Sequence, residues 1–245
     1  MDDWTLKYNE FHPQQERLRE ALCTLGNGYF ACRGAAAEAN TDEHHYPGTY
    51  MAGLYNRRTT TVSGHSVENE SLVKLPNWLP LKLRPEGGEW LSAEDAVFFS
   101  QQLHIDAGIL VREMHFRISQ GVLHYRERRL VHMGEPHLAA QEVTLSTENW
   151  RGDVEIHSAL DGRVRNQGVA RYRGLEDEHL EFLEQDAHEN GQLFLRTRTN
   201  DSRLEVAQAI QSALFVDGEP AALRAETCTQ DGYAEARYRT RLADG

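Results

Sequence analysis

The sequence predicts a mainly all-β protein built from antiparallel sheets, and three observations lead to this class. From about Gly108 onward, apolar and polar residues alternate with a period of two. Turn signals such as "LDGRVRNQG" and "HENGQ" recur at intervals suited to a β-sandwich. No long helical segment separates these stretches, so neighbouring strands are expected to pair antiparallel. A chain of 245 residues can bury a large core, so we expect residues 1–245 to form one domain.

The clearest strand is "GILVREMHFRIS", in which Leu110, Met114, Phe116 and Ile118 fall on one face and charged residues fall on the other. The turn-like segment 119–121 follows, and "VLHYRERRLVHM" then resumes the extended pattern. The two segments therefore predict a β-hairpin.

Further strands are predicted in "HLAAQEVTLST", "GDVEIHSALDG", "QLFLRTRT" and "RLEVAQAIQSAL". The stretch "LEDEHLEFLEQ" fits either a helical turn or a surface strand. The first hundred residues differ, because strand-like pieces there are separated by long irregular loops. In the chain as a whole, few short helical turns are expected. The last segment, "YAEARYRTRLADG", alternates like a strand and stops as if a hairpin had been cut. We therefore expect the chain to be the front of a longer protein.

Charge and cysteine content limit the partners. A formal net charge of −12 disfavours nucleic acid and anionic membranes, which both need a concentrated cationic surface. The start, "MDDWTLKYNEF", has no export signal, and no later stretch is apolar for long enough to cross a bilayer. Cys23, Cys32 and Cys228 are odd in number and lack metal-ligand spacing, so we expect reduced thiols in the cytoplasm.

The glycines of "LGNGYFACRG" invite a phosphate-binding interpretation. Such a loop would have to open a helix, whereas extended sequence follows Gly28. A tight turn is the better interpretation, with Gly26 and Gly28 at positive φ around Asn27.

Twelve histidines, including the pairs His44/His45 and His132/His137, invite a metal-site interpretation. Adjacent side chains on a strand point to opposite faces, and neither pair has a carboxylate or cysteine in ligand register. Solvated or core-edge histidines explain them better, so no metal and no cofactor is expected.

In "VENESL", Glu68 and Glu70 could resemble a paired acid and base. A spacing of two along one strand does not by itself give the required separation across a sugar. Surface charge is therefore the favoured interpretation.

Two aromatic segments remain, "YPGTYMAGLYNR" and "LPNWLPLKL". In the second, Pro76 and Pro80 stiffen the backbone around an amide and an indole, a pairing that suits the hydroxyls and apolar ring face of a sugar. A tryptophan that plugs the sandwich or a domain interface fits equally well. The residues expected to face carbohydrate or to dock another domain are Tyr46, Tyr50, Tyr55, Asn56, Arg57, Asn77 and Trp78.

Five segments in order resemble one known family: "LGNGYFACRGAAAE", "YPGTYMAGLYNR", "ENESLVKLPNWLPLKL", "QQLHIDAGILVRE" and "RRLVHMGEPHLAA". From about Trp4 to its end, the chain resembles the amino-terminal domain of glycoside hydrolase family 65. That family includes maltose, trehalose and kojibiose phosphorylases and related α-glucoside hydrolases.

The resemblance implies a large antiparallel β super-sandwich like that of galactose mutarotase. It also implies a catalytic (α/α)6 barrel beyond residue 245, which would carry the glutamate acid and the phosphate-binding residues. No residue of this chain is then catalytic, and the two aromatic segments would dock against that barrel and help to shape its sugar pocket. The intact protein would be an inverting enzyme acting on glucose disaccharides, with inorganic phosphate as co-substrate if it is a phosphorylase.

The expected partners are the chain's own barrel, a small carbohydrate and, for the intact protein, a second copy in a homodimer. Two other functions stay open from the residues. One is a standalone carbohydrate-binding module built on Trp78 and the tyrosines. The other is a structural or oligomerisation domain.

Overall fold

The computed structural model describes residues 4–119, 121–167 and 176–244. Strands hold 58% of the described residues and helices 6%, so the predicted all-β class is confirmed. Among the described residues, no helix combines the length and apolar character needed to span a bilayer.

The chain forms two compact units, each drawn from separate parts of the sequence. The first unit contains residues 1–47, 81–157 and 239–245, and the second contains residues 48–80 and 158–238. The chain passes between the units four times, twice inside a strand: β11 (Gly152–Asp161) and β18 (Tyr233–Leu242) each contribute residues to both.

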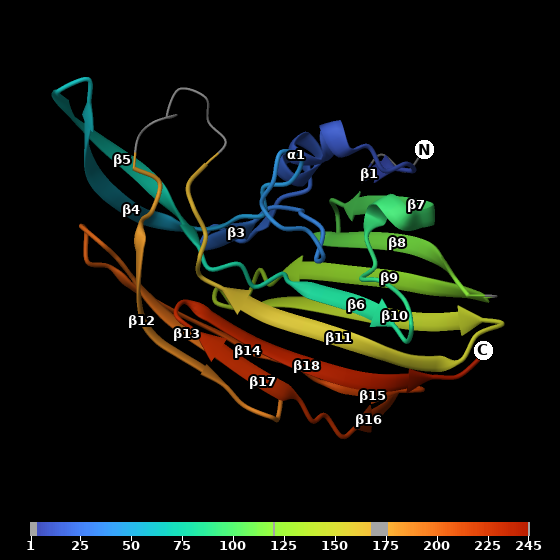
Figure 1. Cartoon of the computed structure of the whole chain (residues 1–245). Helices are drawn as coiled ribbons and strands as arrows, with labels where there is room; N and C mark the ends of the chain where they lie inside the picture. The colour runs from blue at the N-terminus through green and yellow to red at the C-terminus, as the bar shows by residue number, and fades with distance from the viewer. Residues whose placement is uncertain (1–3, 120, 168–175, 245) are drawn as a thin grey trace. The chain divides into compact units, whose positions relative to one another are not determined.

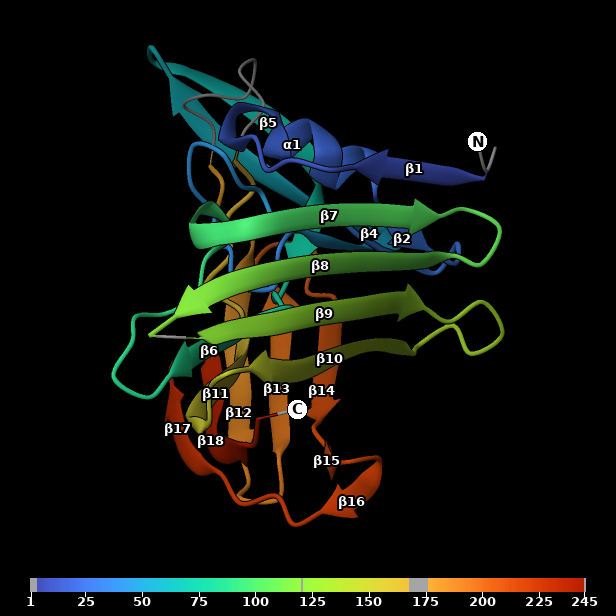
Figure 2. The ribbon, with the colours of Figure 1, turned by 90° about the vertical axis from the view of Figure 1, so that its right-hand side faces the viewer.

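A five-stranded antiparallel sheet with the order β1-β7-β8-β9-β10 dominates the first unit (Figure 2). Its strands are β1 (Thr5–Tyr8), β7 (Ala96–His104), β8 (Ile109–Ile118), β9 (Gly121–Val131) and β10 (Ala139–Glu148). The smaller elements of this unit are α1 (Pro13–Leu22), β2 (Leu25–Gly26), β3 (Phe30–Cys32), β6 (Leu81–Pro85) and the 3-10 turn η1 (Ala93–Asp95). The predicted hairpin is β8–β9, with Ile118 opposite Gly121.

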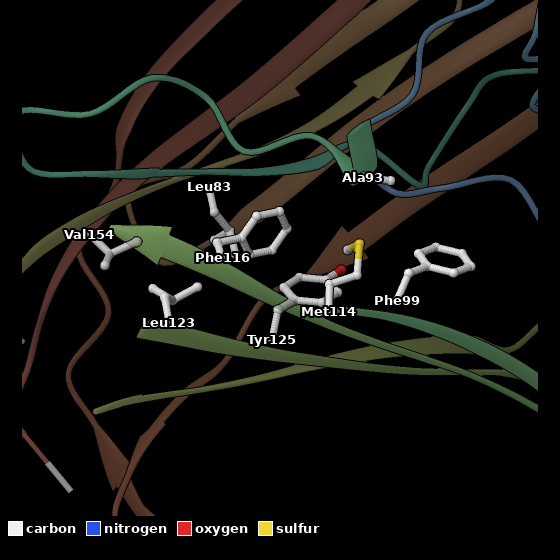
Figure 3. Packing of buried hydrophobic residues seen from close by; sticks show 8 residues of the cluster. All are labelled: Leu83, Ala93, Phe99, Met114, Phe116, Leu123, Tyr125 and Val154. Atoms are coloured by element: carbon white, nitrogen blue, oxygen red, sulfur yellow. The ribbon is translucent and has the colours of Figure 1, made fainter. Parts of the chain in front are cut away.

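The core of the first unit follows from the period-two pattern. Met114 lies opposite Phe99 on one neighbouring strand and opposite Tyr125 on the other, so the three side chains form one row on the same face of the sheet. Phe116 and Leu123 form the next row, and all five side chains are buried together (Figure 3). Apolar burial of this size is the main driving force for folding of the unit.

The next row on this face is polar although it is equally buried. Arg112 of β8 lies between Gln101 of β7 and Glu127 of β9. Its guanidinium donates to Gln101 Oε1 over 3.2 Å and 2.6 Å and approaches Glu127 Oε2 at 3.6 Å. A buried charge is tolerated only when it is paired and hydrogen-bonded, and this row supplies both.

Glu127 is the centre of that network. Arg129 donates to one carboxylate oxygen of Glu127, and Tyr125 donates its hydroxyl to the other over 3.1 Å. Burial, together with the nearby negative charges of Glu127 and Glu38, raises the pKa of Tyr125 well above 10, so the phenol stays a donor. Arg129 also donates to the backbone oxygen of Ala35 over 2.9 Å. The network therefore ties the sheet to the segment that leads from β3 toward the second unit.

The helix α1 is a feature that the sequence interpretation missed. It begins with Pro13 in its first turn and buries Glu16, Arg19 and Glu20. Its apolar residues make up only one turn of the spacing that marks a surface helix, and charged residues occupy the buried side. At ten residues, α1 is longer than the few short helical turns that the sequence predicts, although helices remain a small part of the structure.

The glycine motif forms a turn, as predicted, but only one of the two glycines takes the expected conformation. Gly28 has φ +86°, whereas Gly26 has no positive φ because it is paired with Ala31 in an extended β2–β3 ladder. The Asn27 side chain accepts from the backbone of Tyr29 and completes the turn.

The second unit consists of a long hairpin, several short ladders and a three-stranded sheet. Its strands are β4 (Thr49–Val62), β5 (His65–Leu75), β12 (Leu180–Ala187), β13 (Gln192–Thr199), β14 (Glu205–Gln211), β15 (Leu214–Val216), β16 (Glu219–Ala221) and β17 (Glu226–Gln230), with the parts of β11 and β18 noted above. The sheet order β12-β13-β14 is antiparallel. The stretch "LEDEHLEFLEQ", left open above, contains the start of β12 and is a strand from Leu180.

A small apolar cluster supports the base of the hairpin. Leu54 of β4 packs with Val73 and Leu75 of β5, and Leu180 and Val206 pack against them. The hairpin base is therefore fixed on the three-stranded sheet, and its far half extends from that anchor.

The first prediction concerns the buried network. Glu127→Ala should lower the free energy of unfolding by about 3–5 kcal/mol, because it leaves the charges of Arg112 and Arg129 buried without their carboxylate. Urea unfolding measures the loss. The matched control is Glu142→Ala, which removes an exposed partner of Arg128 and should leave the midpoint unchanged. An equally small effect of both substitutions would contradict the central position of Glu127.

Candidate functional site

The hairpin β4–β5 carries several of the residues that the sequence singled out (Figure 1). Tyr55, Arg57 and Thr59 alternate along β4 and so share one face. Glu70 lies opposite Arg57, and Glu68 lies opposite Thr59. This face therefore combines an aromatic ring, a guanidinium, a hydroxyl and two carboxylates.

An open polar groove of about 500 Å³ lies over this part of the hairpin. We call it the hairpin groove, and its lining residues are Arg57, Arg58, Thr59, Glu68, Glu70, Asp201 and Ser202. Within it, the Arg57 guanidinium lies 3.6 Å from Glu68 and 3.5 Å from Glu70. These exposed ion pairs add little to stability, so the charges remain available for a partner.

The chemistry of the hairpin groove suits a polar ligand that is rich in hydroxyl groups. Tyr55 is not among the lining residues, but it is 46% exposed, shares a face of β4 with Arg57 and Thr59, and offers a ring for stacking next to the groove. The carboxylates of Glu68 and Glu70 accept hydrogen bonds from hydroxyls, and Arg57 donates them. The groove is open and wet, so it lacks the enclosed environment in which two carboxyl groups would act as acid and base.

Asn56 lies on the opposite face of β4 and is fully buried. Its amide nitrogen donates to Asn200 Oδ1 over 2.7 Å and lies 3.0 Å from His179 Nδ1. Its amide oxygen accepts from the backbone nitrogens of Asp201 and Ser202 over 3.2 Å and 3.0 Å. Asn56 therefore clamps the turn after β13 against the hairpin, and its side chain is not positioned to touch a ligand in the groove.

Arg58, a lining residue of the groove, also binds the turn that Asn56 clamps. Its guanidinium lies 3.3 Å from Asp201 and 3.6 Å from Glu176. The turn that supplies Asp201 and Ser202 includes Arg203 with φ 60°, a left-handed conformation that reverses the chain sharply. One rim of the groove is thus held by ion pairs to β4 as well as by the Asn56 amide.

Asn77 is also structural. Its backbone exchanges hydrogen bonds with Asp161 over 2.7 Å and 2.9 Å, and its side-chain oxygen accepts from the backbone of Leu79 over 3.2 Å. Trp78 beside it is half-buried, and its indole nitrogen is buried without a hydrogen-bond partner among the described residues. Neither residue lines the hairpin groove.

The remaining two tyrosines lie apart from each other. Tyr46 belongs to the first unit, where its backbone nitrogen donates to Glu20 over 2.9 Å and its ring lies under the guanidiniums of Arg17 and Arg33. Tyr50 belongs to the second unit and is half-buried beside Gly48, where an added Cβ would lie 2.8 Å from its ring. Of the seven predicted residues, the structure brings together Tyr55 and Arg57 on one exposed face.

The sequence interpretation missed the rest of the groove. Thr59 could have been found, because it continues the alternation of Tyr55 and Arg57 along β4. Asp201 and Ser202 carried no local signal, since they reach the hairpin only through the Asn56 clamp. Among the described residues, no three histidine, cysteine or carboxylate side chains gather as a metal site.

The second prediction tests the clamp through His179. Burial and then the positive charge of Arg58 lower the pKa of His179, outweighing the acidic residues around it: Asp177, Asp201 and Glu176. The unfolded chain therefore takes up a proton that the folded chain resists. Stability should fall as the pH drops below about 6.5, the pKa of an unperturbed histidine.

His179→Gln should remove this part of the pH dependence. Urea unfolding of both proteins at about pH 7.5 and about pH 5.5 measures it, because the histidine titrates between these values. The original chain should lose more stability than the variant over that interval. Equal losses would show that His179 is not held neutral in the folded state.

Nearly the whole chain is similar in sequence to known proteins. The model of the glycosyl hydrolase family 65 N-terminal domain matches residues 6–245. An uncharacterized glycosyl hydrolase of Mycobacterium tuberculosis is 42% identical over 221 residues, which cover 89% of this chain and 17% of that protein. The trehalose 6-phosphate phosphorylase of Lactococcus lactis is 29% identical, with 88% of this chain and 27% of that protein covered.

A solved structure has the same fold. The chain matches a putative kojibiose phosphorylase from the human microbiome with a TM-score of 0.81 and 18% identity, over 98% of this chain and 30% of that one. The chain thus spans between 17% and 30% of the length of these three proteins. The family match over nearly its full length shows that the chain belongs to glycosyl hydrolase family 65, as an N-terminal domain of that family.

Proposed function

We propose that the chain is the accessory N-terminal domain of an inverting α-glucoside phosphorylase or hydrolase that acts on glucose disaccharides. In this proposal the catalytic barrel lies beyond residue 245 and carries the acid, while the present domain packs against it and helps to shape its sugar pocket. The glucoside would be cleaved in one displacement, by phosphate or by activated water. No residue of this chain takes part in bond cleavage.

The family match over residues 6–245 is the observation that carries this proposal. The characterised relatives bear the names trehalose 6-phosphate phosphorylase, kojibiose phosphorylase, trehalose phosphorylase and maltose phosphorylase. Each of them is several times longer than the aligned region, which supports a partner domain within the same polypeptide. Inorganic phosphate is the co-substrate in the phosphorylase case, and no other cofactor is proposed.

The hairpin groove is the part of this domain that we assign to the pocket. Its donors and acceptors, with the exposed Tyr55 ring next to it, match what a sugar presents, and its base is held by the Leu54 cluster and the Asn56 clamp. A rigidly anchored, polar hairpin can form part of the lining of a sugar pocket without taking part in bond cleavage. The proposal also places the protein in the cytoplasm, where the thiols of Cys23, Cys32 and Cys228 stay reduced.

The third prediction tests this role in the intact polypeptide. Tyr55→Ala and Arg57→Ala should each lower kcat/KM for the preferred disaccharide by up to about tenfold. Arg57→Ala removes a hydrogen bond from a charged group, worth about 1.5 kcal/mol, and Tyr55→Ala removes a stacked ring, worth about 1 kcal/mol. Assays of maltose, trehalose, kojibiose and trehalose 6-phosphate, each with and without inorganic phosphate, identify that substrate and its acceptor. The purified 245-residue chain should turn over none of them.

The controls come from the same unit. Arg196 is half-exposed and pairs with two carboxylates, and Phe215 is an exposed ring, so Arg196→Ala and Phe215→Ala match the two test substitutions. Both should leave kcat/KM unchanged. Equal effects of test and control variants would remove the hairpin groove from the pocket. Turnover by the isolated chain would overturn the assignment of the chemistry to the missing part.

A standalone carbohydrate-binding module is the second candidate, favoured by the exposed Tyr55 beside the hairpin groove. Calorimetric titration of the isolated chain with the same disaccharides separates the two functions. A module gives saturable heat that is lost in Tyr55→Ala or Trp78→Ala, whereas a docking surface gives none.

Light scattering measures the molar mass of the isolated chain and of the intact polypeptide. It tests whether the intact polypeptide is a homodimer and whether the isolated chain has an oligomerisation function.

A further inference from the structure

The helix α1 has its charged residues on the inside. Glu16, Arg19 and Glu20 are each no more than 5% exposed. Arg19 donates to Glu16 over 3.2 Å, and Glu20 lies 3.0 Å from His45 and 3.5 Å from Arg33. The inner face is thus bound to the first unit by ion pairs and hydrogen bonds.

The outer face of the same helix is uncharged. Leu18 is 62% exposed and Leu22 is 52% exposed, and they are one turn apart. At 100° per residue, Gln14, Gln15 and Ala21 fall on the same arc, and all three are exposed. All ten residues of α1 are described, and none on this arc carries a formal charge.

This arrangement is the reverse of an ordinary surface helix, which turns its apolar stripe inward and its charges to water. Turning the leucines inward would have buried apolar area, yet the helix instead buries three ionisable groups. Such a surface is typical of a contact that lies outside the structure described.

We propose that the outer face of α1 is a docking surface for the remainder of the same polypeptide, the part that follows residue 245. This inference rests on the proposed function for the existence of that remainder, and it adds the surface by which the two parts meet. The relatives are long enough to supply such a partner, because the chain spans only 17% to 30% of their length. The matching surface on the partner is apolar and uncharged.

The size of the face favours a tethered partner over a second copy. A helix of ten residues is about 15 Å long and about 10 Å wide, so its outer face is far smaller than the roughly 800 Å² that each partner buries in a standard interface. A covalent link gives a high effective concentration and stabilises a contact too small to hold two separate chains.

The fourth prediction uses hydroxyl-radical footprinting of the intact polypeptide and of the 245-residue chain. Oxidation of Leu18 and Leu22 should be several times slower in the intact polypeptide, because the partner covers them. Val97, which is 59% exposed in the same unit, is the internal control and should be oxidised equally in both proteins.

Three results would overturn the proposal. Equal oxidation of Leu18 and Leu22 in both proteins would show that nothing covers the helix. Slow oxidation in the isolated chain at every concentration would show that the chain covers the helix itself. Slow oxidation that disappears on dilution would show a second copy. None of these oxidation rates depends on enzymatic activity. The proposed function is tested separately, by the kcat/KM measurements above.

A substitution gives an independent check. Leu18→Glu with Leu22→Glu should leave the thermal midpoint of the isolated chain unchanged, because both side chains face water there. In the intact polypeptide the same pair should lower the midpoint, since it places two charges in an apolar contact. The control is Leu204→Glu, which lies in the second unit and should have no effect in either protein. An unchanged midpoint for the intact double variant would contradict the docking surface.

Discussion

The buried carboxylate of Glu127 is the constraint on which the first unit depends. It receives Arg112, Arg129 and the Tyr125 hydroxyl on the buried face of the five-stranded sheet, where little water reaches them. Because Arg129 also binds the backbone of Ala35, the network fixes the segment between β3 and the second unit. Removing one member of this buried network leaves a charge of another member unpaired. The network therefore favours the single packing in which all of its members meet.

Buried polar contacts in the same unit also determine which side of α1 is exposed. The segment fixed at Ala35 continues to His45, which meets Glu20 of α1. Since the inner face of α1 must satisfy these charges, its leucines are left on the outer face. In the second unit, the Asn56 clamp acts in a similar way, because it holds one rim of the hairpin groove in place from behind. Both exposed surfaces therefore follow from buried hydrogen bonds beneath them.

Much of the fold was predictable from local alternation. The hairpin β8–β9 and the strand β13 follow from period-two patterns that the core confirms. The helix α1 was not predictable in this way, because its apolar spacing covers a single turn and its buried side is charged. At the candidate site, Tyr55 and Arg57 were found from composition, whereas Asp201 and Ser202 join them through contacts across more than 140 residues of chain. Alternation could not reveal such contacts.

A structure of the intact polypeptide with a bound disaccharide tests the central claim most directly, namely that this domain acts through surfaces turned toward a catalytic part. We expect the Tyr55 ring and the Arg57 guanidinium to lie at the wall of the sugar pocket, with the outer face of α1 buried against residues beyond 245. A hairpin groove that faces solvent far from the sugar, together with an α1 that remains open to water, would contradict the account.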